Sequence, residues 1–436
     1  MTRQRSTTPL RSPDSLRPKG VPLYVHLPFC VVKCTYCDFY SVAEFGGRST
    51  RDQDLDWVLQ SILIEAERRA PKEPVTVFLG GGTPSIHSPE GLAGFLDRLH
   101  DVTGFRDSAV EVTMESNPES LDLETAQAVV EGGVNRISIG VQSFEAATLE
   151  LFDRAHGPDE AESAYRAARD SGVGAVNVDL IYGSPGQDEA SLDRDLQRLA
   201  AWKPDHVSAY SLAYEKGTML TKWREQGTLV ELAEEPARER FQRARHQLST
   251  QGLRPYEVSN FTSKSPCFHN LNAWWNGPYI GLGPSAVSAH HEVRFGQARS
   301  VNAWKRALDE SGDWLSMEWE ERLPFHQRLA ESWWLGLRVT EGVDPRWLAG
   351  PAWEGDAFLH RAQIEAERHA TKDPSVEVTS SLDPVADDRW DMRLAGELIQ
   401  GGWLERAGHR IRVAEHAWPV VDALARKFLE GAPPER

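Results

Sequence analysis

Three cysteines near the N-terminus are spaced closely enough to bind one metal centre. Cys30, Cys34 and Cys37 follow a mostly apolar run at 23–27 and form a Cys-x3-Cys-x2-Cys pattern. The apolar run reads as a buried strand, which places the cysteines on the loop at its C-terminal end. A cubane of four irons and four sulfides takes one protein ligand per iron, so three thiolates leave one iron open to a small molecule. The pattern therefore favours a catalytic [4Fe–4S] cluster over one that only stores electrons.

A structural zinc site is the alternative explanation for these cysteines. Structural zinc takes four ligands, and Asp38 or His26 could supply the fourth. Zinc motifs usually contain two Cys-x2–4-Cys pairs, and this sequence has no second pair. The spacing favours the cluster and leaves zinc open.

Alternating strands and helices must position this loop. The expected strands are 23–27, 75–79, 110–114, 136–141, 176–181 and 207–212. The segments between them have helical periodicity, as at 55–70, where the apolar residues fall on one stripe. Six strands that alternate with helices predict a parallel sheet. We therefore expect an α/β fold, a partial (β/α)6 barrel over 21–215, with its chemistry at the rim formed by the C-terminal strand ends.

Residues that can bind a ligand gather at this rim. The Gly-Gly-Gly-Thr segment at 80–83 would let the backbone approach a ligand closely, although a tight strand-to-helix turn explains it equally well. Glu115 could accept hydrogen bonds from a ribose or serve as a partner for a helix N-terminus. Three further residues are weak signals individually, and their shared position near the rim favours a binding role: Gln142, Arg154 and Asp179.

Composition and charge exclude several classes of protein. The chain has 436 residues, enough for two or three domains, and its net charge of −17 argues against broad binding to nucleic acids or anionic membranes. Four cysteines, three of them clustered, indicate a metal site in a reducing compartment. No run of eighteen apolar residues is present, and residues 1–20 resemble a disordered tail more than a secretory signal. We therefore expect a cytoplasmic protein.

The second half of the chain is expected to be mainly helical. We assign 216–300 to an extension of the barrel, with a charged helical stretch at 215–252 followed by a segment rich in aromatic residues and glycine. Helices are expected to predominate over 301–436, with a polar loop or insertion at 371–389. The order helix, strand, strand, helix from 393 to 429 indicates a small winged-helix-like domain.

The motifs, taken in order, give the chain a family resemblance. The cysteine loop after the first strand resembles the signature of the radical S-adenosylmethionine (SAM) proteins. Further segments follow in order: Gly-Gly-Gly-Thr-Pro-Ser, Glu-Ser-Asn-Pro, 135–144, Arg154-x-His156 and 177–186. Together they resemble the oxygen-independent coproporphyrinogen III oxidase group over 21–430. The resemblance implies that SAM chelates the open iron, in a region lined by Tyr24, Tyr36, Gly81, Gly82, Thr83, Glu115, Gln142, Arg154, Asp179 and Ala213.

Two branches of that group differ within the cysteine loop. The true oxidases usually carry a further cysteine two residues after the third, where this chain has Phe39. The haem chaperone branch, of the HemW type, has an aromatic residue there and a downstream Cys-x-His-Asn-Leu-x-Tyr-Trp segment tied to haem binding. This chain has a similar segment at 267–274. The chain is thus identified as a member of the haem chaperone branch.

The downstream segment contains the candidate haem-binding residues, which are Cys267, His269, Asn270 and Trp274. Thiolate and imidazole are both good axial ligands for haem iron, and a tryptophan can pack on the porphyrin face. A hydrogen-bonded structural histidine explains His269 equally well. The segment departs from the branch pattern because Ala273 replaces the usual tyrosine, and Val287 stands where a histidine is often found. The axial ligand is left open.

The resemblance implies a radical SAM haem chaperone that binds a [4Fe–4S] cluster, SAM and haem. It would deliver haem to acceptor haemoproteins, with membrane respiratory enzymes as candidates. The alternative is the oxygen-independent coproporphyrinogen III oxidase (dehydrogenase), which would decarboxylate two propionates by 5′-deoxyadenosyl radical chemistry. No nucleic-acid partner is expected, and a homodimer is left open.

Overall fold

The computed structural model describes residues 20–43, 48–290, 293–311, 317–346, 348 and 389–432. The tail expected at 1–20 and the loop expected at 371–389 fall outside these residues except for Gly20 and Arg389. None of the described helices combines the length and the apolar composition needed to cross a bilayer.

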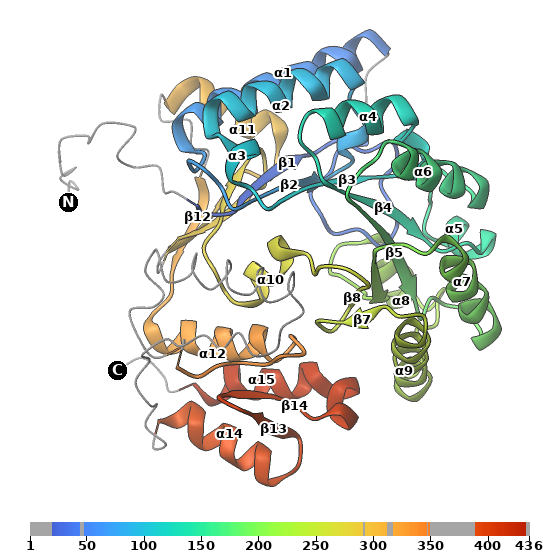
Figure 1. The fold of residues 1–436 in the computed structure, drawn as a ribbon, viewed down its shortest axis with the longest axis vertical. Coiled ribbons are helices and arrows are strands. Elements are labelled where there is room, and N and C mark those ends of the chain that lie inside the picture. Colours follow the sequence, from blue (N-terminus) through green and yellow to red (C-terminus); the bar gives the residue numbers. More distant parts are fainter. Residues whose placement is uncertain are drawn as a thin grey trace, which may run out of the picture.

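A mainly parallel sheet of nine strands forms the larger part of the structure (Figure 1). Its first six strands lie side by side in chain order and are mutually parallel: β1 (Leu23–Leu27), β2 (Thr76–Gly81), β3 (Glu111–Ser116), β4 (Arg136–Gln142), β5 (Ala175–Tyr182) and β6 (His206–Ser211). β9 (Ile280–Leu282) is parallel to β1. At the other edge, β8 (Asn260–Thr262) is antiparallel to β6, and β7 (Arg254–Pro255) is antiparallel to β8. The predicted parallel α/β architecture is confirmed.

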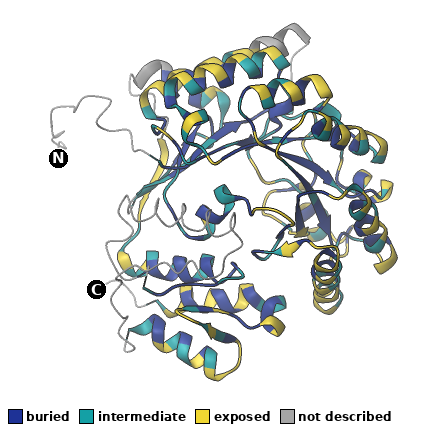
Figure 2. Cartoon of the chain, viewed as in Figure 1, coloured by how far each residue is buried: buried dark blue, intermediate teal, exposed yellow. Residues whose placement is uncertain are grey.

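Helices connect the strands and cover the outer face of the sheet (Figures 1 and 2). They are α1 (Arg48–Arg69), α2 (Pro89–Thr103), α3 (Phe105–Ser108), α4 (Leu123–Glu131), α5 (Ala146–Leu151), α6 (Pro158–Asp170) and α7 (Glu189–Trp202). Local sequence determines where they begin and end. In α2 the Ser88 side chain accepts a hydrogen bond from the Gly91 N–H at the start, and Gly104 adopts a left-handed conformation at the end. The inner face of α2 is apolar apart from Thr103 and joins the main core through Leu92, Phe95, Leu96 and Leu99.

The remainder of the chain adds helices, a second sheet and a small C-terminal unit. Beyond the barrel lie α8 (Met219–Glu225), α9 (Glu234–Thr250), α10 (Phe268–Trp274), β10 (Val287–His290), β11 (Val293–Gln297), α11 (Val301–Ser311) and β12 (Met317–Arg322). The C-terminal unit consists of α12 (Phe325–Gly336), α14 (Trp390–Gln400), β13 (Leu404–Ala407), β14 (Arg410–Val413) and α15 (Val421–Gly431). It has its own apolar core, in which the rings of Trp333 and Phe428 stack at 4.6 Å.

Three features of this half differ from the sequence-based expectation. The stretch expected to be one helical segment at 215–252 contains two helices, α8 and α9. β12 is a strand in a region expected to be helical, and it pairs with β11 in an antiparallel sheet. β9 has only three residues, one of them Gly281, and it carries no recognisable strand pattern. Each of these strands depends on pairing with distant residues, which local periodicity does not report.

Glu65 holds β9 beside β1. This α1 side chain is fully buried and accepts hydrogen bonds from the Gly283 N–H at 2.9 Å and from Gln297 Nε2 at 2.7 Å. It also pairs with Arg69, one turn further along α1. A buried carboxylate is tolerated when charge and hydrogen-bond donors surround it, and here those donors belong to the segment that closes the barrel.

Glu65→Ala should lower the free energy of unfolding by about 3 kcal/mol, because it leaves Arg69 and the donors of Gly283 and Gln297 without their buried acceptor. Urea unfolding of the reduced apoprotein measures this change. The control is Glu67→Ala on the same helix, where an exposed ion pair with Arg98 is lost and a change below about 1 kcal/mol is expected. Equal effects of the two substitutions would contradict the role given to Glu65.

Candidate functional site

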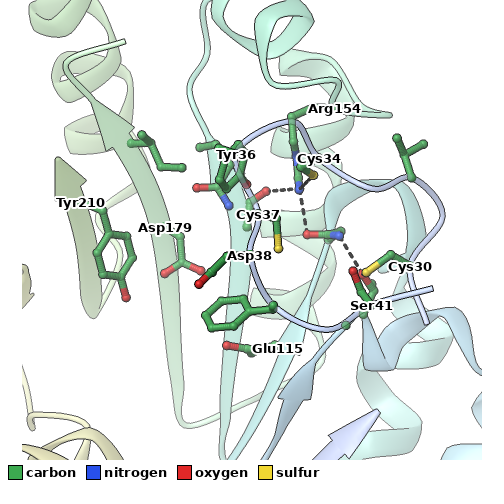
Figure 3. Close-up of a pocket in the computed structure, with 18 of the residues that line it drawn as sticks. Cys30, Cys34, Tyr36, Cys37, Asp38, Ser41, Glu115, Arg154, Asp179 and Tyr210 are labelled. Carbon is green, nitrogen blue, oxygen red and sulfur yellow. Dashed lines mark hydrogen bonds between the residues drawn. The ribbon is translucent and has the colours of Figure 1, made fainter. Parts of the chain in front are cut away.

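The C-terminal ends of β1–β6 surround a pocket of about 440 Å³. The loop after β1 carries Cys30, Cys34 and Cys37 along one side of it (Figure 3). Nine of the ten residues expected around SAM line this pocket: Tyr36, Gly81, Gly82, Thr83, Glu115, Gln142, Arg154, Asp179 and Ala213. They come from six different strands or the loops that follow them, so the parallel arrangement of the sheet brings them together.

Tyr24 is the tenth of these residues and is not among those that line the pocket. Its hydroxyl lies 2.9 Å from Nδ1 of His26, and its ring lies 6.5 Å from the ring of His269. The position of Tyr24 near the start of β1 places it deeper in the barrel, between the pocket and α10.

Side chains from other segments donate to the sulfurs of Cys30 and Cys34, and the Phe39 backbone donates to that of Cys37. Oγ1 of Thr83 lies 3.5 Å from Sγ of Cys30, and Nη1 of Arg154 lies 3.3 Å from Sγ of Cys34. Such donors suit thiolate ligands of an iron–sulfur cluster, whose potential is tuned by hydrogen bonds to sulfur. Burial raises the pKa of Cys30 and raises that of Cys37 to about 11, so metal binding must release protons from these thiols.

The two residues that could complete a zinc site with the cysteines lie in different surroundings. In the described part of the chain, no three side chains of His, Cys, Asp or Glu are grouped so as to hold a single metal ion. Asp38 lies on the cysteine loop and lines the pocket, while both ring nitrogens of His26 are engaged, by Tyr24 and by the Tyr40 carbonyl.

Arg154 ties the cysteine loop to the ends of two strands. Besides Cys34, its guanidinium donates to Oδ1 of Asn117 at 2.8 Å, at the end of β3, and to the carbonyl of Gly140 in β4. Nδ2 of Asn117 in turn donates to Oγ1 of Thr83 at 2.9 Å. One half-buried guanidinium thereby fixes the loop, the glycine segment and the third strand relative to one another.

The glycine segment at the end of β2 has no room for side chains. A Cβ at Gly80 would lie 2.3 Å from Oε2 of Glu115, and one at Gly82 would lie 2.5 Å from the Leu27 carbonyl. Gly81 has a φ of +94°, and its N–H donates to Oε2 of Glu115 at 3.0 Å. The segment must therefore be glycine for the backbone to enter the pocket.

In the described part of the chain, the Gly81 N–H is the one hydrogen-bond donor to the Glu115 carboxyl. Burial raises its pKa to about 7, the Gly81 N–H opposes this shift, and the nearby Asp179 adds to it. Asp179 itself accepts from Nδ2 of Asn177 at 2.7 Å and from Oγ of Ser138 at 3.2 Å, and burial also raises its pKa. Two neighbouring carboxyls thus face the pocket, where a ligand with hydroxyl or amino groups would supply the missing donors.

Gln142 adopts a strained conformation beside them. Its φ is +68°, in the left-handed region that non-glycine residues rarely occupy, where the pairing of β4 with β5 is irregular. Strain of this kind is typical of ligand-binding positions because the surrounding structure must impose it.

Several pocket residues were not singled out from the sequence. Asn117 belongs to the Glu-Ser-Asn-Pro segment that follows β3, so that segment was the available signal. Tyr210 and Leu212 lie at the end of the sixth strand, where position alone could have indicated them. The contact of Arg154 with the Gly140 carbonyl could not be predicted from the sequence, because every residue has a backbone carbonyl.

The Cys267–Trp274 segment lies at the opposite end of the barrel, against the starts of the strands. Glu111, the first residue of β3, accepts hydrogen bonds from Sγ of Cys267 at 3.1 Å and from the N–H groups of Phe268 and His269 at 2.9 and 3.2 Å. The hydroxyl of Tyr256 accepts from the Cys267 N–H and also contacts Nε2 of His206, the first residue of β6. α10 is thus fastened to the N-terminal edge of the sheet.

The four candidate haem residues differ in exposure. Cys267 is fully buried, while His269, Asn270 and Trp274 are partly exposed. Nδ1 of His269 lies 2.9 Å from Oγ1 of Thr76, and its ring lies 5.0 Å from that of Phe78. Trp274 lies at the other end of α10, 5.9 Å from the guanidinium of Arg338 in the loop after α12.

Comparison with known proteins identifies the family. Residues 24–199 match the model of the radical SAM superfamily. The chain is 35% identical to the haem chaperone HemW of Mycobacterium tuberculosis over 334 residues, which cover 75% of this chain and 83% of that protein. It is 34% identical to HemW of Escherichia coli over 284 residues, 65% and 73% of the two chains. The chain belongs to the HemW family of radical SAM proteins.

The fold is shared with a solved member of the wider group. Coproporphyrinogen III oxidase (HemN) of Escherichia coli, a radical SAM enzyme, superposes with a TM-score of 0.72, covering 95% of this chain and 92% of that one at 19% identity. The predicted partial barrel and the predicted membership of the haem chaperone branch are confirmed. Radical SAM membership also implies a [4Fe–4S] cluster and SAM, which the thiols and donors of the rim pocket fit.

The raised pKa of Glu115 predicts a pH-dependent stability. The carboxyl titrates near 4.5 when unfolded and near 7 when folded, so the apoprotein loses stability as pH rises between these values. Glu115→Gln removes this loss. The stability of the variant relative to wild type should therefore rise by about 2 kcal/mol from pH 4.5 to pH 8, since each pKa unit is worth about 1.4 kcal/mol and partial exposure reduces the full value.

Urea unfolding of the two apoproteins across this pH range measures the difference. Glu124→Gln, at an exposed position on α4, is the control, and its free energy of unfolding should depend on pH as that of wild type does. If the free energy of unfolding depended on pH in the same way for wild type and Glu115→Gln, the raised pKa given to Glu115 would be contradicted.

Proposed function

We propose that this HemW-family protein is a haem chaperone of the reducing cytoplasm. It binds a [4Fe–4S] cluster through Cys30, Cys34 and Cys37, SAM in the rim pocket, and haem at α10, and it delivers the haem to acceptor haemoproteins. The observation that carries the proposal is the 35% identity to a haem chaperone over 83% of that protein's length. The geometry of α10 supports it independently.

The rim pocket supports binding of the cluster and SAM. The cluster supplies an electron and an open coordination site when it is bound. Thr83 and Arg154 would donate to its sulfur ligands, as they do to the free thiols. Glu115 and Asp179 would accept hydrogen bonds from hydroxyl or amino groups of SAM, and the glycine segment lets the ligand lie against the backbone.

His269 is the better axial ligand for haem of the two candidates. Burial lowers its pKa to about 3, aided by the charge of Arg136, so the imidazole is neutral and able to bind iron. Among the described residues, no side chain or backbone group hydrogen-bonds to its Nε2. Burial and the nearby Glu111 raise the pKa of Cys267, whose sulfur is enclosed and already donates to that carboxylate.

A haem bound at α10 would lie apart from the rim pocket. Thr76 contacts His269 at the start of β2, whereas Gly81 lines the rim pocket at its end. The five steps from Thr76 to Gly81 along the strand span about 16 Å. A radical formed in the rim pocket must touch the carbon from which it takes hydrogen, so a macrocycle bound at α10 would be out of its reach.

The coproporphyrinogen oxidase alternative has less support in the pocket. Phe39 stands at the position of the additional oxidase cysteine, lines the pocket and is 65% exposed. The 0.72 TM-score with coproporphyrinogen III oxidase comes at 19% identity and therefore reports a shared fold.

His269→Ala should weaken haem binding at least tenfold, because it removes the iron ligand. Titrating the anaerobically reconstituted protein with haem, followed by the Soret band, measures the affinity. Cys267→Ala should retain binding, since that sulfur is enclosed. His409→Ala, in the exposed turn between β13 and β14, controls for adventitious binding to surface histidines.

Two further measurements test the function itself. Haem-loaded protein should transfer haem to an apo-haemoprotein, and reduced protein with SAM should not convert coproporphyrinogen III to protoporphyrinogen. The oxidase alternative would be established instead by two results together. The protein would convert coproporphyrinogen, and His269→Ala would leave the Soret band of the haem titration unchanged.

A further inference from the structure

The first turn of α10 is held by two residues that the sequence did not single out. Thr76 and Glu111 are directly paired across β2 and β3, at the starts of the two strands. Both are buried, with exposures of 2% and 5%. Each contacts the segment at 267–269, although 156 to 193 residues of chain separate them from it.

Glu111 fixes the backbone of that turn. Its two carboxylate oxygens accept from the thiol of Cys267 and from the N–H groups of Phe268 and His269. These N–H groups are free at the start of a helix and need an acceptor there. The carboxylate therefore determines where the Cα of His269 lies.

Thr76 fixes the ring of the same residue. Its hydroxyl lies 2.9 Å from Nδ1 of His269, and the Phe78 ring lies 5.0 Å from the imidazole and limits its rotation. A hydroxyl can accept as well as donate a hydrogen bond. When it accepts from the Nδ1–H, the lone pair is on Nε2, which is the tautomer that an iron ligand requires. Metal-binding histidines usually donate their second ring N–H to such a partner.

We propose that Thr76 and Glu111 are the positioning residues of the haem site, with Thr76 selecting the iron-binding tautomer of His269 and Glu111 fixing the backbone beneath it. This inference rests on the proposed binding of haem through His269. It predicts that the properties of the bound iron depend on a hydroxyl that does not contact the iron.

Thr76→Val tests the role of the hydroxyl while preserving shape. We expect haem affinity to fall about tenfold, the range typical for a lost partner of a metal-binding histidine. We also expect the midpoint potential of the bound haem to rise, because the imidazole becomes a weaker donor to ferric iron. Thr76→Ser, which keeps the hydroxyl, should restore both values.

Thr113→Val is the matched control. Thr113 lies on β3, is fully buried, and its hydroxyl has no hydrogen-bond partner among the described residues. The same substitution there should leave affinity and potential unchanged. A Thr76→Val protein that is only less stable would hold less haem, but the potential of the haem that remains bound would not move.

The outcomes separate this inference from the function on which it rests. If His269→Ala abolishes haem binding while Thr76→Val matches Thr113→Val in affinity and potential, the role of Thr76 is refuted and the haem site stands. If His269→Ala binds haem as wild type does, both the ligand assignment and this inference are refuted.

Glu111→Gln tests the backbone contact in the apoprotein. A glutamine amide has one oxygen to accept with and an NH2 group in place of the other, so amide hydrogen exchange in the peptide containing Phe268 and His269 should become at least tenfold faster. Glu65→Gln, at a buried carboxylate that accepts from a backbone N–H elsewhere in the fold, should leave that peptide unchanged. Unchanged exchange in Glu111→Gln would overturn the role of Glu111.

Discussion

The common direction of β1–β6 is the constraint on which both sites depend. Parallel strands place all their C-terminal ends at one edge of the sheet and all their N-terminal ends at the other. The first edge carries the cysteine loop, the glycine segment and the pocket carboxyls. The second edge carries Thr76, Glu111 and His206, which hold α10 and the residues before it. Reversing one strand would move its polar end groups from one site to the other.

The buried carboxylates show how the two edges differ. Glu111 receives three donors from a single turn of chain, so its charge is matched within the protein. Glu115 receives the Gly81 N–H and lies close to a second carboxyl, Asp179, so its pKa is raised to about 7. A carboxylate with a complete set of donors serves structure, whereas one with an incomplete set is suited to complete it with a ligand. Each site therefore contains a glutamate. The one at α10 has its hydrogen-bond donors within the protein, and the one in the rim pocket leaves room for donors from a ligand.

Much of the fold and of the rim pocket could be predicted from the sequence. The strands and their helices have clear local periodicity, and the motifs after β1, β2 and β3 follow directly from strand ends. A strand runs from one end of the barrel to the other, and its side chains alternate between the two faces of the sheet. A motif that includes a strand residue such as Tyr24 therefore does not tell how far that residue lies from the rim. The pocket therefore contains Tyr36 and not Tyr24.

The placement of α10 could not be predicted in the same way. Its contacts with Thr76 and Glu111 join residues more than 150 positions apart, and neither residue belongs to a recognisable motif. β9 is a similar case, since its three residues become a strand only through β1 and Glu65. Sequence periodicity reports which face of an element is apolar, and these features depend on which distant element covers that face.

The pairing of β9 with β1 determines how much of the chain can be isolated as a folded unit. A fragment that ended at residue 215 would include all six parallel strands, but both outer strands would lose a neighbour, β9 on one side and β8 on the other. The backbone groups of β1 would then be open to pairing with other molecules, next to the loop that carries the cysteines. Such a fragment should aggregate. A fragment that folds as a soluble barrel must also include the segment at 280–297, in which Gly283 and Gln297 donate hydrogen bonds to Glu65.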